Sequence, residues 1–250
     1  MKYEKPQKGN PHQLTIHQHC FPRRSIERFC DDTGRVKVHL IEQGKTVSLK
    51  PNDPIFCARR AWDQRAESIF MQEIENAYQE LANRIEAGAL VRRLNATERR
   101  VVSDMYSLWN LRWYWKRQPL EDQELVGVLA PSNDYSRDQR EMLEKHHVMS
   151  VKANGDRVRI PGRHFTGARI QIDLGRIRDE LRRCSWGIVR SRVGEFIVPD
   201  NSSGKIILPI SPTLCFTNRE GYGVVSDSAL KEMNERSKQE SEVFYFGRNL

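Results

Sequence analysis

Apolar residues recur at helical spacing in the first half of the chain. Between Trp62 and about Ile85 they fall three or four residues apart, which predicts one long amphipathic helix that ends near Gly88. The stretch Asn95-Ala96-Thr97-Glu98 has the form of a capping box, in which two side chains satisfy the first free N–H groups of a helix. It predicts a second long helix that continues to about Lys116.

The other periodic segments are shorter. Strands are predicted at 35–40 and 46–49, as a hairpin, and at 157–160, 169–174, 186–190, 195–198, 205–210, 214–217 and 243–246, and short helices at 122–129, 136–149, 175–183 and 228–241. This order predicts an α+β protein with a mainly helical N-terminal half and a mixed or antiparallel β-sheet in the C-terminal half. We expect residues 1–250 to form a single domain, with residues 1–13 as a loose polar arm.

Composition narrows the class of protein. The chain has 250 residues, of which 38% are hydrophobic and 30% charged, as in water-soluble globular proteins. No apolar run approaches the roughly 20 residues that a membrane span needs, so no membrane partner is expected. The five cysteines are odd in number and none has C-x-x-C spacing, which favours a reducing cytoplasm over a disulfide scaffold or a zinc ribbon.

Positive charge is concentrated in one stretch. The formal net charge is +8, and residues 157–192 contain ten arginines, no lysine and only three acidic residues. Arginine suits phosphate because its planar fork donates two hydrogen bonds at once. The stretch therefore predicts a surface for RNA or DNA, with Arg157, Arg159, Arg163, Arg169 and Arg176 as contacts. In the alternative interpretation, these arginines only fill the solvent face of strands.

One arginine falls on an apolar face. On the predicted second helix, Arg112 projects between Leu108 and Trp109, within the arc that faces the core. An unpaired buried charge is costly, so carboxylates must lie opposite it. We expect Arg112 to pair with Glu67 or Glu75 of the preceding helix. The pair is either a structural ion pair that fixes helix register, which we favour, or an electrostatic centre for phosphate or acid–base chemistry.

Several short motifs resemble a bacterial domain of unknown function, DUF family 4238. The stretch from His19-Cys20-Phe21-Pro22-Arg23 to Phe29 is similar to its opening motif. Glu67 with Glu75, Arg112, Asp200-Asn201, the strand at 208–212 and Asn234 resemble its later motifs, whereas Ile26, Pro199 and Ser202 depart from the family pattern. The resemblance brings no established activity. It implies that seven residues converge on one polar site: His19, Arg23, Glu67, Glu75, Arg112, Asp200 and Asn201. Families of this kind occur among mobile and defence genes, which favours a nucleic-acid-directed role.

These inferences lead to three hypotheses about function. In the first, the protein is a metal-dependent phosphodiesterase or nuclease. Glu67, Glu75 and Asp200 would hold Mg²⁺ or Mn²⁺ or activate water, with His19 as general acid or base and both Arg23 and Arg112 stabilising phosphate charge. In the second, the protein is a non-catalytic module that binds nucleic acid, a small anion or a protein, and the same polar set is structural. The third is an enzyme acting on a small phosphorylated ligand.

Overall fold

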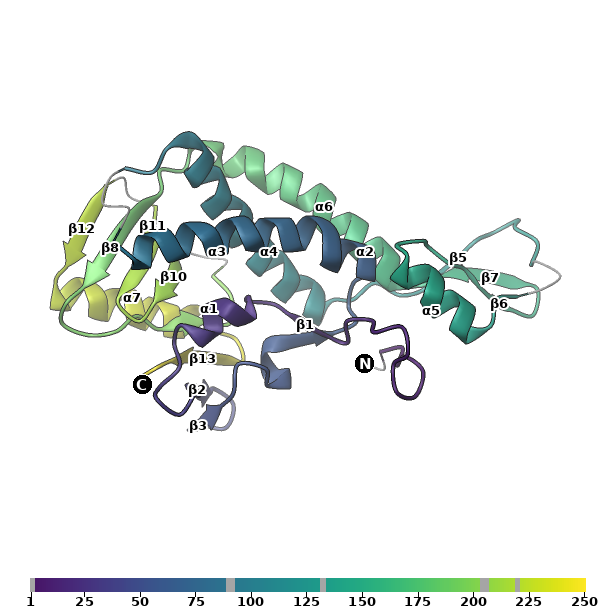
Figure 1. Cartoon of the computed structure of the whole chain (residues 1–250), viewed down its shortest axis with the longest axis horizontal. Coiled ribbons are helices and arrows are strands. Elements are labelled where there is room, and N and C mark those ends of the chain that lie inside the picture. Colours follow the sequence, from purple (N-terminus) through teal and green to yellow (C-terminus); the bar gives the residue numbers. More distant parts are fainter. Residues whose placement is uncertain (1–2, 89–92, 131–133, 203–206, 219–220) are drawn as a thin grey trace.

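Three long helices cross the centre of the molecule (Figure 1). The computed structural model describes residues 3–88, 93–130, 134–202, 207–218 and 221–250. The helices are α3 (Gln72–Glu86), α4 (Ala96–Arg117) and α6 (Gly162–Glu180), and α4 packs against both of the others. Figure 1 shows how they separate a group of strands at one end of the molecule from a projecting sheet at the other.

The helices begin where side chains cap them. The capping box predicted at Asn95 and Glu98 is confirmed, since each side chain accepts a hydrogen bond from the other residue's backbone N–H. The single helix predicted from Trp62 consists of three consecutive helical segments. Helix α2 (Gln64–Ala66) is followed by a π-helical turn at Glu67–Met71, and α3 begins directly after it. The shorter helices are α1 (Arg23–Glu27), α5 (Arg137–Lys145) and α7 (Asp227–Glu240), with 3-10 turns at Pro54–Phe56 and Leu181–Arg183.

The described strands form four sheets. Two of them have four strands each. The first has the order β10 (Ile207–Ser211), β11 (Leu214–Thr217), β8 (Gly187–Ser191) and β12 (Tyr222–Val225). The second has the order β3 (Lys45–Leu49), β2 (Val36–Leu40), β13 (Phe244–Gly247) and β9 (Val198–Pro199). The smaller two are β1 (His17–His19) with β4 (Cys57–Arg59), and β5 (Gln123–Glu124), β7 (Arg157–Ile160) and β6 (Lys152–Asn154). Only the pairing of β12 with β8 is parallel among them.

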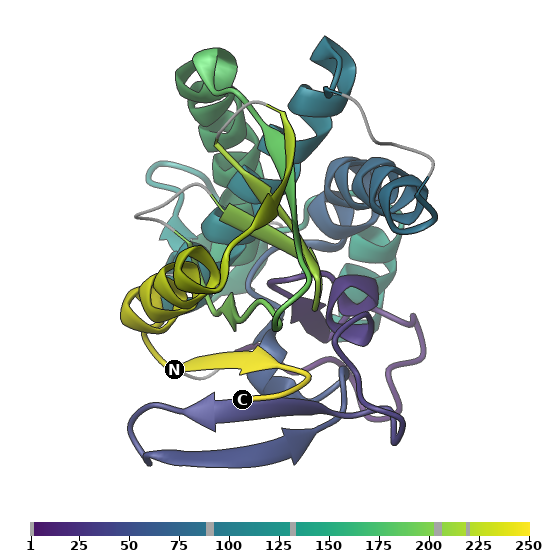
Figure 2. The same cartoon turned by 90° about the vertical axis from the view of Figure 1, so that its left-hand side faces the viewer.

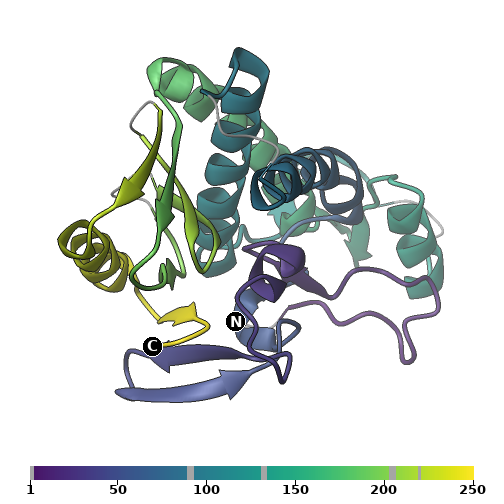
Figure 3. The same cartoon turned by 60° about the vertical axis from the view of Figure 1, so that its left-hand side comes forward.

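The protein is α+β, but its halves are not cleanly separated. The C-terminal strand β13 pairs with β2 of the N-terminal hairpin, so one sheet joins the two ends of the chain (Figure 2). The other four-stranded sheet packs between helices (Figure 3). Leu230 of α7 contacts Cys215 on one face, while Trp186 donates a hydrogen bond to Ser103 of α4 on the other.

Three predicted elements differ from the structure. The strand expected at 195–198 is reduced to β9 (Val198–Pro199), since residues 195–197 belong to no strand. The other two differ in type. Residues 169–174, expected as a strand, belong to α6, and residues 122–129, expected as a helix, contain β5 instead. In the first case, Ile170 and Leu174 are buried one helical turn apart while Ile172 is 65% exposed, so only a helix places the apolar pair on the core. The predicted strand at 205–210 is β10 from Ile207 onwards, and positions 205 and 206 lie outside the described residues.

The core is built largely from aromatic side chains. Trp62, Trp109 and Trp186 are fully buried, and Phe246 of β13 packs edge-on against both Phe29 and Phe56. In the described parts of the chain, we find no helix with the length and hydropathy to cross a membrane.

Candidate functional site

Arg112 forms the centre of a buried ionic cluster between two helices. Its side chain is 1% exposed on α4, and its guanidinium donates a hydrogen bond to Glu75 of α3. The second terminal nitrogen of Arg112 lies 3.7 Å from Glu67 Oε2 on the π-helical turn. The predicted pairing is confirmed, and both carboxylates take part.

Trp62 completes this cluster. Its ring centre lies 5.6 Å from the guanidinium carbon of Arg112, and its indole N–H donates a 2.6 Å hydrogen bond to Glu67 Oε2. Guanidinium groups stack favourably on aromatic rings, so the tryptophan stabilises both charged partners. Two nitrogens of Arg112, Nε and Nη2, have no hydrogen-bond acceptor among the described residues.

Burial and neighbouring charges shift the pKa values of both Glu67 and Arg112. Burial raises the pKa of Glu67, although Arg112 and the Trp62 hydrogen bond favour its charged form. For Arg112, burial disfavours the charge, but Glu75 and Glu67 outweigh burial and raise its pKa. Arg112 therefore keeps its charge, while burial favours the protonated form of Glu67.

His19 lies near this cluster but bonds elsewhere. Its Nε2 is 3.0 Å from the carbonyl oxygen of Pro51, and burial lowers its pKa, with the charges of Glu75 and Arg112 acting on it in opposite directions. Arg23, by contrast, is exposed and pairs with Glu27 one turn along α1, 2.8 Å away. The charges of Glu75, Arg112 and Arg23 all act on His19, whose hydrogen bond goes to Pro51, while the Arg23 side chain lies at the surface.

Asp200 and Asn201 belong to a different network. The Asp200 carboxylate accepts hydrogen bonds from the backbone N–H groups of Glu242, Val243 and Phe244, between α7 and β13, and from the Asn201 side chain. Burial raises the pKa of Asp200, and these hydrogen bonds act against it. These hydrogen bonds hold the chain's last strand in place, whereas Glu67 and Glu75 bond to Trp62 and Arg112.

No metal-binding set is assembled in the described parts of the chain. No group of three His, Cys, Asp or Glu side chains there is arranged to hold a metal ion. The proposed trio of Glu67, Glu75 and Asp200 is divided between two networks, and Asp200 already accepts four hydrogen bonds. These residues do not fit Mg²⁺ or Mn²⁺, which need several oxygen ligands around one point.

The predicted arginine surface is largely neutralised. Arg157 and Arg159 of β7 lie 3.7 Å and 3.4 Å from the same carboxylate of Glu124. Arg169 and Arg176 of α6 both approach Asp173, and Arg163 has a side chain only 9% exposed that binds Glu144. These residues are divided between strand β7 and helix α6, and each of them pairs with a carboxylate.

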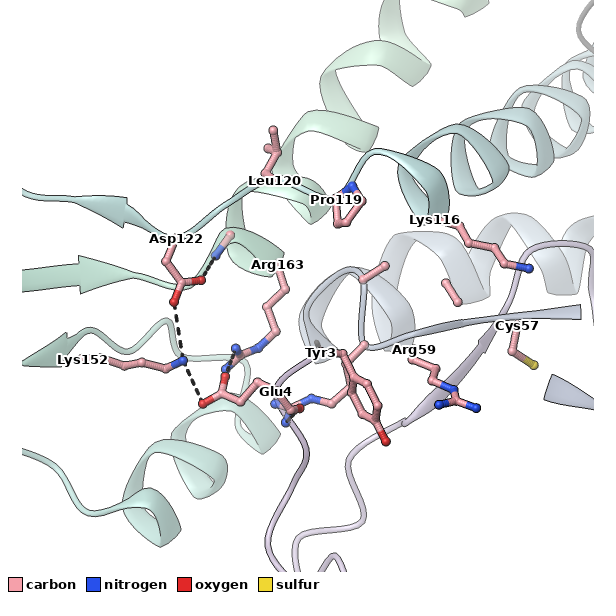
Figure 4. Close-up of a pocket in the computed structure, with 14 residues that line it drawn as sticks. Tyr3, Glu4, Cys57, Arg59, Lys116, Pro119, Leu120, Asp122, Lys152 and Arg163 are labelled. Atoms are coloured by element: carbon pink, nitrogen blue, oxygen red, sulfur yellow. Dashed lines mark hydrogen bonds and ion pairs between the residues drawn. The ribbon is translucent and has the colours of Figure 1, made fainter. Parts of the chain in front are cut away.

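Sequence reasoning missed a cavity lined by basic side chains. It has a volume of about 530 Å³ and lies where β4, the end of α4 and the start of α6 meet (Figure 4). Five cationic side chains line it: Arg59, Arg60, Lys116, Lys152 and Arg163. The acidic residues in its lining are Glu4 and Asp122. The cavity therefore has an excess of positive charge and suits an anionic ligand.

Two of these cations have no carboxylate partner in the described structure. Arg59 is exposed and lies over the ring of Tyr3, 5.7 Å from its centre. Lys116 donates to the carbonyl oxygen of Ile55 and lies 4.8 Å from the centre of the Trp113 ring. Neither forms an ion pair in the regions that the structure describes, so both can accept an anion without first breaking a salt bridge.

Other parts of the cavity wall are held firmly. Arg60 has a φ of 44°, a conformation that favours glycine, and it forms a buried 2.6 Å ion pair with Glu144. The start of α6 approaches residue 120 so closely that a Cβ on Gly162 would overlap the carbonyl oxygen of Leu120. Burial raises the pKa of the Cys57 thiol to about 12, so this cavity residue is protonated and is not a nucleophile.

A signal for this cavity is present in the sequence but dispersed. Its cations come from positions as far apart as Arg59, Lys116 and Arg163, and no local cluster marks them.

Comparison with known proteins gives no matching family model, no matching curated protein and no matching solved structure.

Proposed function

We propose that the protein binds single-stranded nucleic acid through the basic cavity. The observation that carries this proposal is the pair Arg59 and Lys116, two cationic residues of the cavity lining that have no carboxylate partner in the described structure. Sites for single strands combine a positive groove that follows the phosphates with aromatic rings on which bases stack. Tyr3 lies in the cavity lining beside Arg59, but it belongs to the N-terminal segment, so the proposal rests on the cations and not on this ring.

The neighbouring sheet extends the basic surface. Strand β7 leads directly into α6, and its Arg157 and Arg159 share the single carboxylate of Glu124. One positive charge of this trio is left uncompensated on β7. The proposal retains the nucleic-acid role expected from the net charge of +8 and from the family resemblance, but moves its centre from α6 to the cavity.

We expect the double variant Arg59→Ala/Lys116→Ala to bind a fluorescent single-stranded RNA or DNA oligonucleotide roughly 10- to 100-fold more weakly than the wild type. Each lost phosphate contact also lowers the slope of log K against log salt by about 1, so the slope falls by about 2. Fluorescence anisotropy at several salt concentrations measures both quantities.

The matched control is Arg23→Ala/Lys231→Ala. It removes the same charge from two exposed residues that pair with Glu27 and Asp227, away from the cavity lining. If the cavity variant binds the oligonucleotide as tightly as this control does, the proposal is refuted. If both variants bind more weakly than the wild type by the same factor, net charge alone drives binding.

A second function is favoured by the environment of Glu67. A carboxyl group with a raised pKa beside the ionic partner Arg112 and a second carboxylate is a typical arrangement for general acid catalysis. A surface depression of about 270 Å³ opens onto both Glu67 and Glu75. Under this hypothesis the protein is a phosphodiesterase in which Glu67 donates a proton and Arg112 stabilises phosphate charge.

We expect Glu67→Gln to abolish cleavage of labelled RNA or DNA if this second function holds. Gel assays of the wild type with and without Mg²⁺ or Mn²⁺ establish whether cleavage occurs, and Glu27→Gln, at an exposed residue of α1, is the control. Absence of cleavage by the wild type, or equal cleavage by both variants, would leave only the binding function.

A further inference from the structure

The N-terminal segment covers one side of the basic cavity. Residues 3–13 contain no helix or strand, and Tyr3 and Glu4 form part of the cavity lining. The Glu4 carboxylate binds Arg163 and lies 2.8 Å from the ammonium group of Lys152, while its backbone carbonyl accepts a 3.0 Å hydrogen bond from Arg60 (Figure 4). A single acidic residue thus engages three of the five cations.

Glu4 is held as an anion. Burial opposes its charge, but Arg163 and Lys152 outweigh burial and lower its pKa to about 2. Two cations that donate to one carboxylate provide the same kind of charge-assisted hydrogen bonds that proteins use for a phosphate oxygen.

The cations do not depend on Glu4 for their positions. Glu144 holds both Arg60, at 2.6 Å, and Arg163, at 2.7 Å. Asp122 lies 3.7 Å from Lys152 and accepts a hydrogen bond from the first backbone N–H of α6. The anion site is therefore preorganised by other carboxylates and would keep its shape if Glu4 left it.

The segment can leave without opening the core. None of residues 3–13 belongs to the buried core, and Leu14, at 3% exposure, is the first described residue that does. Its other attachments are polar contacts and one stacking contact. Gln7 donates to the buried Glu141 and to the exposed Asp138, and His12 also bonds to Asp138. Arg137 donates to the carbonyl oxygen of Lys5, and Arg59 lies over the ring of Tyr3. Displacement of the segment would cost polar contacts that water can replace.

We propose that Glu4 is an internal competitor, which occupies the place of a phosphate group and is displaced when a phosphate-bearing ligand binds. This inference rests on the proposed nucleic-acid function, and it adds both a phosphate subsite at Arg163 and Lys152 and a means of regulating it. The phosphate can belong to the oligonucleotide backbone, to its 5′ end or to free inorganic phosphate, and the experiment separates these sources.

The test compares Glu4→Gln with Glu27→Gln, which removes an equal charge from an exposed ion pair on α1. We expect Glu4→Gln to bind an oligonucleotide about 10-fold more tightly than the wild type, because the internal competitor is weakened. Binding of 5′-phosphorylated and unphosphorylated oligonucleotides, and competition by inorganic phosphate, show which phosphate enters the subsite. Glu27→Gln should bind as the wild type does.

Hydrogen–deuterium exchange of residues 5–13 supplies an independent readout. We expect faster exchange in Glu4→Gln without ligand, and in the wild type when oligonucleotide or inorganic phosphate is added. If oligonucleotide binding depends on Arg59 and Lys116 but neither affinity nor exchange responds to Glu4, the inference fails and the proposed function stands. If no oligonucleotide binds but inorganic phosphate still accelerates exchange, the proposed function fails and the displaceable phosphate subsite stands. If neither ligand changes the exchange, the inference is refuted.

Discussion

Replacing Arg112 by alanine should lower the free energy of unfolding by about 3–5 kcal/mol, the range measured when one partner of a buried ion pair is removed. The side chain is 1% exposed, and its loss leaves Glu67 and Glu75 facing each other without the compensating charge. It also leaves a cavity next to the ring of Trp62, which adds to the cost. Urea unfolding followed by tryptophan fluorescence measures the change.

Arg117→Ala is the matched control for this substitution. Arg117 lies on the same helix with a side chain 46% exposed, where it pairs with Glu242, and its removal should cost no more than about 1 kcal/mol. The double variant Arg112→Ala/Glu67→Gln should recover part of the loss, because it no longer leaves a charge at Glu67. A cost for Arg112→Ala as small as that for Arg117→Ala would show that the cluster contributes little to stability.

Asp200→Ala should be the second most destabilising change, with a loss of roughly 3 kcal/mol or more. Its carboxylate accepts backbone N–H groups at 3.1 Å from Glu242, 2.6 Å from Val243 and 3.0 Å from Phe244. The Phe244 donor is buried and costs about 1–3 kcal/mol without an acceptor, and loss of the two partly buried hydrogen bonds to the carboxylate adds to this cost. Because β13 lies between β2 and β9, the effect should extend through that sheet.

The same unfolding assay, combined with hydrogen exchange at 242–247, tests this prediction. Asp227→Ala is the control, since Asp227 is 57% exposed on α7 and pairs only with Lys231 in the described structure. Asp200→Asn should lie between the two, because it keeps one oxygen acceptor. A stable Asp200→Ala variant with unchanged exchange at 242–247 would contradict the structural role assigned to this residue.

The two substitutions also separate the two networks. Arg112 and Asp200 were expected to act in one site, yet they stabilise different contacts: α3 with α4 in one case, and the α7–β13 connection with β9 in the other. Since they share no partner, the destabilisations of the double variant should add. An ion pair whose removal affects stability in this way need not have a catalytic role.

Features that depend on nearby residues were determined by the sequence alone. The capping box at Asn95 and the β2–β3 hairpin follow from groups a few positions apart, where hydrogen bonds and side-chain period leave few alternatives. The pairing of Arg112 also followed, because a guanidinium on an apolar helix face requires a buried acceptor and the preceding helix offered two.

Only the tertiary structure decided how distant segments meet. Alternation at 169–174 suits a strand locally, and packing of Ile170 and Leu174 on the core made it helical. The sequence showed Asp200 as a strand-end acid, but only the return of the chain at residues 242–244 provided its three backbone donors. Arg59, Lys116 and Arg163 share a cavity because β4, α4 and α6 converge there. Periodicity and capping act over a few residues, whereas a shared cavity depends on long-range packing that no local pattern encodes.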